Sequence, residues 1–310
     1  MTQEIYKRYR PSNFKQVVGQ PEAIKVLTDY LRRDSVPHTV LFTGPSGCGK
    51  TTLARILARK LGCKAADFDE INAAKERGID TIRSISDRMS LSPLVSSCRV
   101  WLIDETHALT SDAQSSLLKM LEDTPSHVYF FLATTDPQKL KQTIKTRSAL
   151  IKCVPIKQKD MQGLIESICK KEKTELSEEV IERIIEVADG SARMALVILD
   201  QIIGLADEDE QLSAIQAQDI RAAAIEICRT MIDPRKKWGD LAPILEKVED
   251  DPEGIRNLIL AYFTKVLLGA RKGGNADRAA EILDLFEDNF YDGKRASLVK
   301  ACYYAMQRGK

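Results

Sequence analysis

The octapeptide GPSGCGKT, residues 44–51, combines three glycines with a lysine and a threonine. It matches the pattern G-x-x-x-x-G-K-[S/T], in which glycines let backbone N–H groups curl around an anion. An apolar run precedes it and the helical pattern TTLARILARKL follows, so the start of that helix would add partial positive charge. Lys50 would then reach the β- and γ-phosphates of a nucleotide, and Thr51 would bind Mg²⁺. The alternative, a glycine-rich turn without a ligand, is disfavoured by these flanking patterns.

A second apolar run ends in two acidic residues. VWLIDETH, residues 100–107, predicts a strand that ends at Asp104 and Glu105, and parallel strands gather ligands at their carboxyl ends. Asp104 would hold a metal through water, while Glu105 would act as a general base on the attacking water. Alone, such a pair is well explained as a helix cap. Beside a phosphate loop, it favours nucleotide hydrolysis.

A third run, YFFLATTDP at residues 129–137, ends in Thr134 and Thr135. The Thr135 hydroxyl is a candidate for positioning the attacking water. The alternative is that both threonines cap the following turn.

Composition excludes several classes of protein. The 310 residues are 44% hydrophobic and 29% charged with a net charge of +1, so any nucleic-acid contact would come from local patches. Seven cysteines stand singly without a C-x-x-C pair, which argues against structural zinc and fits a reducing cytoplasm. No N-terminal signal pattern is visible, and the apolar run Leu258–Leu268 is too short to cross a bilayer.

The order of patterns predicts an α/β fold followed by helices. Strands are expected at Thr39–Phe42, Asp67–Ile71, Val100–Asp104 and Val128–Ala133, alternating with helices as in a parallel sheet. After Asp160 the patterns are helical, with Ser177 and Ser191 as helix starts and the acidic stretch 206–213 as a linker. We therefore expect a P-loop sheet domain at 1–155, a small helical domain at 156–208 and an all-helical domain at 209–310.

Several segments together resemble one family. They are YKRYRPSNFKQVVGQ (6–20), GPSGCGKTT (44–52), INAAKERGID (71–80), LIDETHALTSDAQSSLLKMLEDTP (102–125), FFLATTDPQKL (130–140), TRS (146–148) and GSARMALVILDQ (190–201). This set resembles the AAA+ ATPase subunits of sliding-clamp loaders. LLKMLEDTP and ATTDPQKL are similar to the bacterial gamma/tau subunit, and ERGID is similar to replication factor C small subunits; a phage clamp-loader large subunit is a further candidate.

The resemblance implies an ATPase that opens a sliding clamp and loads it on primer–template DNA, with ATP and Mg²⁺ as cofactors. The helical domains would be a lid and an oligomerisation collar. Implied partners are a homo- or hetero-oligomeric ring of five subunits, the clamp and the DNA. The location would be the bacterial cytoplasm, or the host cytoplasm for a phage protein.

Two features depart from the bacterial pattern. The bacterial relatives carry a cysteine-rich zinc module after the first helix of the P-loop domain, whereas LGCKAADFDEI here contains only Cys63. Their S-R-C motif is replaced by Thr146-Arg147-Ser148. The arginine is retained, so its implied role is kept.

The resemblance also assigns roles to single residues. Arg147 would act in trans, reaching the γ-phosphate bound by the neighbouring subunit; its own sequence neighbourhood offers it no obvious partner, and the alternative is a residue at a helix end. Arg193 of the lid would contact the nucleotide of its own chain. The implied ATP-binding residues are Tyr6, Lys7, Arg8, Tyr9, Val18, Gly47, Cys48, Gly49, Lys50, Thr51, Thr52 and Arg193. For the N-terminal members, ordinary packing is the alternative.

Contacts with DNA and clamp are expected on the sheet domain. Lys75, Arg77, Arg83 and Arg88 lie in or beside a predicted helix over 79–91 and would contact phosphates, or else form a solvated charged face. The family suggests that Arg77 acts toward a neighbour's nucleotide and that Gln114 links DNA contact to Glu105. The stretch SLSPLVSS (90–97) would contact the clamp, or is a plain loop.

Two other functions remain open. One is a different AAA+ DNA motor, such as a branch-migration helicase, and ATTDPQKL argues against it. The other is a non-hydrolysing stator subunit, which the intact Lys50, Thr51, Asp104 and Glu105 disfavour.

Overall fold

A computed structural model describes residues 3–246, 248, 251–269, 275–290 and 293–308. The chain divides into two compact units, Met1–Gly204 and Leu205–Lys310. The predicted lid, 156–208, thus lies almost wholly in the first unit, and its separation from the sheet as a domain stays a prediction.

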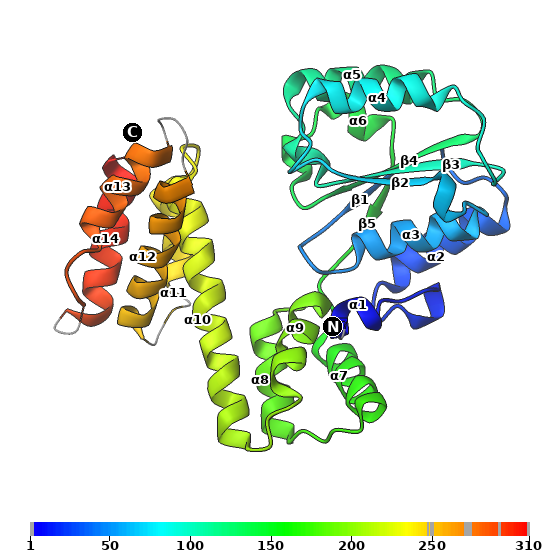
Figure 1. Ribbon diagram of the computed structural model, residues 1–310. Coiled ribbons are helices and arrows are strands. Elements are labelled where there is room, and N and C mark those ends of the chain that lie inside the picture. The colour runs from blue at the N-terminus through cyan, green and yellow to red at the C-terminus, as the bar shows by residue number, and fades with distance from the viewer. Residues whose placement is uncertain (1–2, 247, 249–250, 270–274, 291–292, 309–310) are drawn as a thin grey trace. The chain divides into compact units, whose positions relative to one another are not determined.

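The first unit is built on a five-stranded parallel sheet, which confirms the predicted α/β fold (Figure 1). The strand order is β2-β3-β4-β1-β5. The strands are β1 (Thr39–Thr43), β2 (Phe68–Asn72), β3 (Arg99–Asp104), β4 (Val128–Thr134) and β5 (Ala149–Lys152). The first four match the predicted strands to within a residue or two, and β5 is an edge strand that was not predicted.

Both faces of the sheet are covered by helices (Figure 1). Helices α2 (Pro21–Arg32) and α3 (Lys50–Lys60) pack on one face, and α4 (Ile79–Met89), α5 (Ser111–Glu122) and α6 (Gln142–Thr146) on the other. Because successive strand residues point to opposite faces, Val40 and Phe42 enter the first core and Leu41 the second. Burial on both sides explains why these strands read as continuous apolar runs.

Three helices follow β5: α7 (Gln158–Glu172), α8 (Glu178–Ala188) and α9 (Ala192–Ile202). The predicted caps are confirmed, since the hydroxyls of Ser177 and Ser191 accept hydrogen bonds from the N–H groups of Val180 and Met194. The short N-terminal helix α1 (Ile5–Arg8) packs on α9 through buried Ile5. Short 3₁₀ turns are η1 (Phe14–Gln16), η2 (Ala65–Asp67), η3 (Thr106–Ala108) and η4 (Pro137–Lys139).

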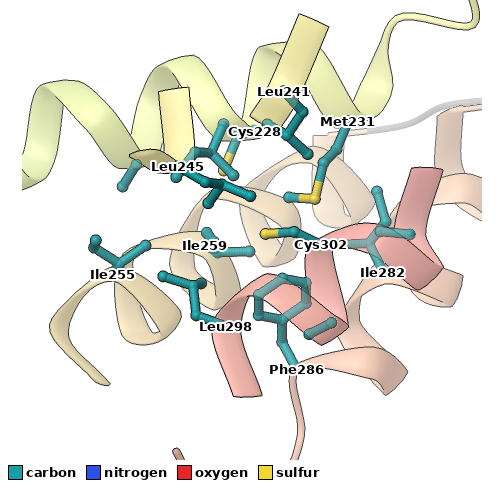
Figure 2. Packing of buried hydrophobic residues seen from close by; sticks show 14 of the residues in the cluster. Cys228, Met231, Leu241, Leu245, Ile255, Ile259, Ile282, Phe286, Leu298 and Cys302 are labelled. Carbon is teal, nitrogen blue, oxygen red and sulfur yellow. The ribbon is translucent and has the colours of Figure 1, made fainter. Parts of the chain in front are cut away.

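The second unit is helical where the structure describes it. Its helices are α10 (Glu208–Ile232), α11 (Trp238–Glu246), α12 (Pro252–Gly269), α13 (Asn275–Leu285) and α14 (Lys294–Arg308). They enclose one apolar core, of which Figure 2 shows Ile259, Phe286 and Cys302. The predicted linker 206–213 is wrong, because the Asp207 carboxylate accepts the N–H of Glu210 and starts α10 inside that stretch. None of the helices described here is both long and apolar enough to span a bilayer.

Candidate nucleotide-binding site

A cleft lies within the first unit where the phosphate loop, the end of β3, the N-terminal arm and the lid helices meet. Four segments of the chain contribute to its lining, so its shape depends on the fold and not on one motif. The lining residues are Tyr6, Tyr9, Arg10, Pro11, Val17, Val18, Ser46, Gly47, Cys48, Gly49, Lys50, Thr51, Thr52, Asp104, Glu105, Ile156, Leu164, Ala192, Arg193 and Leu196.

The phosphate loop runs from the end of β1 to the start of α3 and packs against neighbouring backbone. At Gly44 (φ +144°) a Cβ atom would lie 2.2 Å from the Cys153 carbonyl oxygen. At Gly47 (φ +75°) it would lie 1.9 Å from the Ser191 hydroxyl, at the start of α9. Only glycine fits these positions. The loop therefore touches both the residue after β5 and the first residues of the lid helix.

Lys50 and Thr51 begin α3 and face different partners. Lys50 is only 6% exposed, and its Nζ donates to the carbonyls of Gly44 (2.8 Å) and Pro45 (2.7 Å). Its ammonium group is thereby held over the loop. The Thr51 hydroxyl donates to Asp104 Oδ2 at 3.2 Å, so the structure brings the two predicted metal-site residues together.

The paired oxygens of Thr51 and Asp104 fit a hard divalent cation. Mg²⁺ prefers such oxygen ligands and usually keeps several waters. Burial raises the pKa of the Asp104 carboxyl group, although the Glu105 N–H and the Thr51 hydroxyl oppose this rise. A cation beside the carboxylate would favour its charged form.

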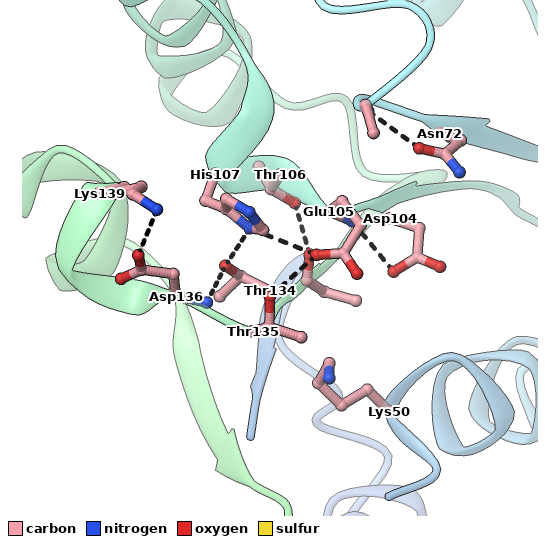
Figure 3. A network of polar contacts seen from close by, with 12 residues as sticks. Lys50, Asn72, Asp104, Glu105, Thr106, His107, Thr134, Thr135, Asp136 and Lys139 are labelled. Carbon is pink, nitrogen blue, oxygen red and sulfur yellow. Dashed lines mark hydrogen bonds and ion pairs between the residues drawn. The ribbon is translucent and has the colours of Figure 1, made fainter. Parts of the chain in front are cut away.

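Glu105 belongs to a network of polar contacts shown in Figure 3. Thr135 Oγ1 donates to Glu105 Oε2 at 3.1 Å. His107 Nδ1 lies 3.3 Å from the same carboxylate oxygen and 3.0 Å from Thr134 Oγ1. The carboxylate is thus oriented from two sides. His107 was not predicted from the sequence, although its place in DETH, two residues after Glu105, was an available signal.

Gln114 has no described contact with Glu105. Its buried carboxamide donates to the carbonyls of Leu109 (3.2 Å) and Lys139 (3.4 Å) and accepts the N–H of Lys141 (3.0 Å). Gln114 therefore holds the backbone beyond β4. Any link to Glu105 would have to pass through that segment.

The other side of the cleft is formed by the N-terminal arm and the lid. Tyr6, Tyr9, Val18 and Arg193 line it, and the Arg193 guanidinium lies 5.9 Å from the centre of the Tyr6 ring. Lys7 and Arg8 do not line it. Lys7 pairs with the Glu4 carboxylate at 2.5 Å, and Arg8 pairs with that of Glu172 at 3.0 Å.

Arg10 lines the cleft and was not predicted. Burial and the nearby charges of Arg55 and Arg193 lower its pKa. Among the described residues its guanidinium has neither a hydrogen-bond nor an ion-pair partner. An anionic ligand would relieve this concentration of positive charge. The signal in the sequence was its place in YRP, directly after two predicted site residues.

Arg147 lies at the end of α6, outside the cleft of its own chain. Its Nη2 atom is 2.6 Å from a carboxylate oxygen of Glu122, and its side chain is 41% exposed. This partner is no sequence neighbour of Arg147, since Glu122 lies at the end of α5 and only the fold brings the two residues together. Exposed ion pairs of this kind are weak, so Arg147 can exchange this partner for another.

The predicted DNA-contact residues differ in their partners. Arg83 pairs with Asp80 at 3.1 Å, and Arg88 lies 3.7 Å from Asp69. Lys75 and Arg77 are exposed, with no ion pair in the part of the chain that the structure describes. Lys75 and Arg77 are thus the two of the four whose positive charges no carboxylate among the described residues neutralises.

The fold and the cleft define a P-loop nucleotide-binding protein. Solved structures of Thermotoga maritima RuvB, one of them described as the Holliday junction branch migration motor, share its fold. For that structure the TM-score is 0.53 and the identity 22%, over 88% of this chain and 85% of the other. At this identity the likeness extends to the fold alone, which is that of AAA+ ATPases.

In sequence, the chain is similar to subunits of DNA polymerase III. The model described as DNA polymerase III, delta subunit, matches residues 19–77 and 64–157. Subunit tau of Bacillus subtilis strain 168 is 35% identical over 227 residues, 66% of this chain and 40% of its own length. The DNA polymerase III subunit gamma/tau of Mycobacterium tuberculosis H37Rv is 34% identical over 66% of this chain and 39% of its own length. Subunit gamma of Buchnera aphidicola is 32% identical over 68% of this chain and 64% of its own length.

The chain is therefore similar in sequence to clamp-loader subunits of the AAA+ family. It spans about two fifths of the length of the gamma/tau relatives from Mycobacterium and Bacillus.

Proposed function

We propose that this protein is the ATP-hydrolysing subunit of a clamp loader, which opens a sliding clamp and loads it on primer–template DNA. The observation that supports this most directly is that Lys50, Thr51, Asp104 and Glu105 meet at one cleft, lined also by Arg193 of the lid. A stator subunit would have no need for this complete set. The similarity to gamma/tau subunits supports a loader in preference to another AAA+ DNA motor.

Each residue has a chemical role in the proposed reaction. Lys50 would stabilise the charge that develops on the phosphates, and Mg²⁺ held by Thr51 and Asp104 would neutralise the β- and γ-oxygens. Glu105, oriented by Thr135 and His107, would accept a proton from the attacking water.

Arg147 would complete the site of a neighbouring subunit in the loader ring. Its position outside its own cleft and its weak, exposed pairing with Glu122 suit that role. A guanidinium from another chain stabilises the transition state only when the subunits are correctly docked. Hydrolysis would then depend on assembly.

The clamp would bind the loop 90–97, hereafter the clamp loop. Leu91, Leu94 and Val95 are exposed on it, Leu94 to 72%. The loop is nevertheless fixed, because the Asp67 carboxylate accepts the N–H groups of Leu94 (2.5 Å), Val95 (2.9 Å) and Ser96 (2.8 Å). A rigid loop loses little entropy when its apolar side chains bind a partner.

DNA contact is proposed for Lys75 and Arg77, which precede α4 on the same unit. Several subunits would together present enough such residues to hold the duplex phosphates. The proposed cytoplasmic location follows from this role in replication.

The first test is nucleotide binding. Lys50→Ala should abolish tight ATP binding, measured by filter binding or calorimetry, because the loop then loses its fixed cation. Retained affinity would remove the assignment of the cleft.

The second test is the ATPase rate with and without primer–template DNA and the clamp of the same organism. A loader should respond synergistically to the two together. Stimulation by DNA alone, accompanied by unwinding, would instead indicate a helicase-type motor, and no turnover would indicate a stator.

A further inference from the structure

Two pairs of neighbouring thiols lie in the first unit. All seven cysteines are free and buried. Cys48 of the phosphate loop and Cys153 are buried in the same apolar core, as are Cys63 and Cys98, and within each pair one thiol shifts the pKa of the other. The members of each pair are far apart in sequence. The fold alone brings them together.

Cys48 and Cys153 join two functional segments. The Gln20 carboxamide is buried, and its Nε2 atom donates to the carbonyls of Cys48 (3.1 Å) and Val154 (2.6 Å). Its Oε1 atom accepts the N–H of Val154 at 3.0 Å. Cys153 itself packs against Gly44, at the other end of the loop. One side chain therefore ties the phosphate loop to the segment that leads from β5 toward the lid.

The two pairs differ in reactivity. A hydrogen bond from Cys153 and the charge of Lys50 lower the pKa of Cys48, against the effect of burial, while Cys153 has a raised pKa and stays protonated. Burial raises the pKa of Cys63 to about 12 and also raises that of Cys98. Since thiolates are the reactive form, only the first pair contains a nucleophile. Cys48 also lines the nucleotide cleft, where a small oxidant can enter.

We propose that Cys48 is a thiol modification site within the nucleotide cleft, and that a peroxide converts Cys48 and Cys153 into a disulfide. The disulfide fastens the phosphate loop to the segment after β5 and closes the cleft to ATP. The consequence for ATP rests on the proposed function. The thiol chemistry does not.

The reaction balances in two steps. The Cys48 thiolate attacks hydrogen peroxide, the O–O bond breaks, and the products are a Cys48 sulfenic acid and hydroxide. The Cys153 sulfur then attacks the sulfenic sulfur, forming the S–S bond and breaking the S–O bond. The departing hydroxide takes the Cys153 proton and leaves as water. In total, two thiols and one peroxide give one disulfide and two waters.

The bond changes the loop because a disulfide is short. The S–S distance is about 2.05 Å with a restricted dihedral angle, so Cys48 must move toward Cys153 and away from its hydrogen bond to the Pro45 carbonyl. The N–H groups on either side of Cys48 move with it. These are the groups that a phosphate would need.

The experiment treats the full chain with hydrogen peroxide and maps disulfides by mass spectrometry without reduction. A fluorescent ATP analogue then measures binding before oxidation, after it and after reduction by a thiol. We expect a Cys48–Cys153 peptide and a loss of affinity of about tenfold or more, the scale of one lost charge-assisted phosphate contact. Reduction should restore binding, and bound ATP with Mg²⁺ should slow the oxidation.

Variants separate the two pairs. Cys63→Ser should behave as the parent protein. Peroxide should not change the ATP affinity of Cys48→Ser, whatever that affinity is before treatment, and Cys153→Ser should accumulate a sulfenic acid that dimedone traps at Cys48. A Cys63–Cys98 disulfide in place of the expected one, or a Cys48–Cys153 disulfide that leaves binding unchanged, would overturn the proposal. If the reduced protein bound no ATP, the proposed function would fail while the mapping still decided the thiol chemistry.

Discussion

At the scale of single residues, the proposed function assigns some groups of the site to holding the nucleotide and others to acting on it. Lys50 and Thr51 are fixed by short contacts within their own chain. Glu105 is oriented by Thr135 and His107. Arg147 is the exception, since its contact with Glu122 is exposed and easily exchanged. The proposed reaction therefore also depends on a residue whose contact within its own chain is weak.

Arg147→Ala tests that dependence. ATP affinity should change less than about twofold, while turnover in the assembled loader should fall about 10³-fold or more, the scale of arginines supplied in trans. Binding by calorimetry and steady-state ATPase assays measure the two effects. Glu122→Ala is the matched control, because it removes the ion pair and keeps the arginine; its turnover should stay near that of the parent, since exposed pairs contribute only about 0–1 kcal/mol. Equal losses in both variants would indicate a structural role for the pair.

Sequence patterns identified the residues that lie within motifs and missed those that only the fold brings together. Lys50, Thr51, Asp104 and Glu105 follow from two local patterns. His107 contacts Thr134, which lies at the end of β4 and is distant in sequence. Glu122 contacts Arg147 only because α5 packs against α6. The pairing of Cys48 with Cys153 could not be predicted either, because the two residues are far apart in the sequence and belong to no recognisable cysteine motif.

At the scale of elements, the same reasoning explains which strands were predictable. β1 and β4 are buried on both faces and appear as apolar runs. β5, with the sequence ALIK, has only Ile151 buried, so neither an apolar run nor a clear alternation marks it. The order of strands in the sheet depends on long-range pairing. No local pattern encodes it.

The clamp loop depends on one carboxylate, and this gives a pH prediction. Burial alone would raise the pKa of Asp67, but hydrogen bonds from the backbone of the clamp loop outweigh it and lower the pKa to about 2. In an unfolded chain the pKa of an aspartate is about 3.9. A lowered native pKa stabilises the fold above the unfolded value, and this contribution is lost as the pH falls from about 4 toward about 2.

Asp67→Asn should therefore be less stable than the parent at pH 7, and the difference should shrink as the pH falls from about 4 toward about 2. Urea unfolding at several pH values measures it. Asp69→Asn is the control, because Asp69 is more exposed and its contact with Arg88 is long, at 3.7 Å. Its stability should show little such dependence on pH. A difference for Asp67→Asn that did not vary with pH would show that the charge of Asp67 is unimportant.

The apolar residues of the clamp loop give a separate prediction. Leu94→Ser should weaken clamp binding about tenfold, as expected for a residue at the centre of an interface. Stability should change by less than about 0.5 kcal/mol, since the side chain is 72% exposed. Leu150→Ser on β5, 62% exposed, is the matched control and should leave clamp affinity unchanged. Surface plasmon resonance with immobilised clamp distinguishes the two.

At the scale of the whole molecule, one chain is an incomplete enzyme under the proposed function. Its net charge of +1 gives no strong attraction to DNA, and its Arg147 lies outside its own cleft. Both features become useful when copies assemble head to tail, because basic residues then add up around the duplex and each cleft receives an arginine from the next copy.

Mixing two inactive variants tests this arrangement. Lys50→Ala lacks the nucleotide site but can donate Arg147, whereas Arg147→Ala binds ATP but cannot complete a neighbour's site. Combined at equal ratio in a loader with adjacent copies of this chain, about a quarter of randomly formed interfaces would join both intact groups, and turnover should recover to about that fraction. Light scattering must first show that each variant assembles. Absence of recovery at every ratio, with assembly intact, would mean that each chain hydrolyses ATP with its own residues alone.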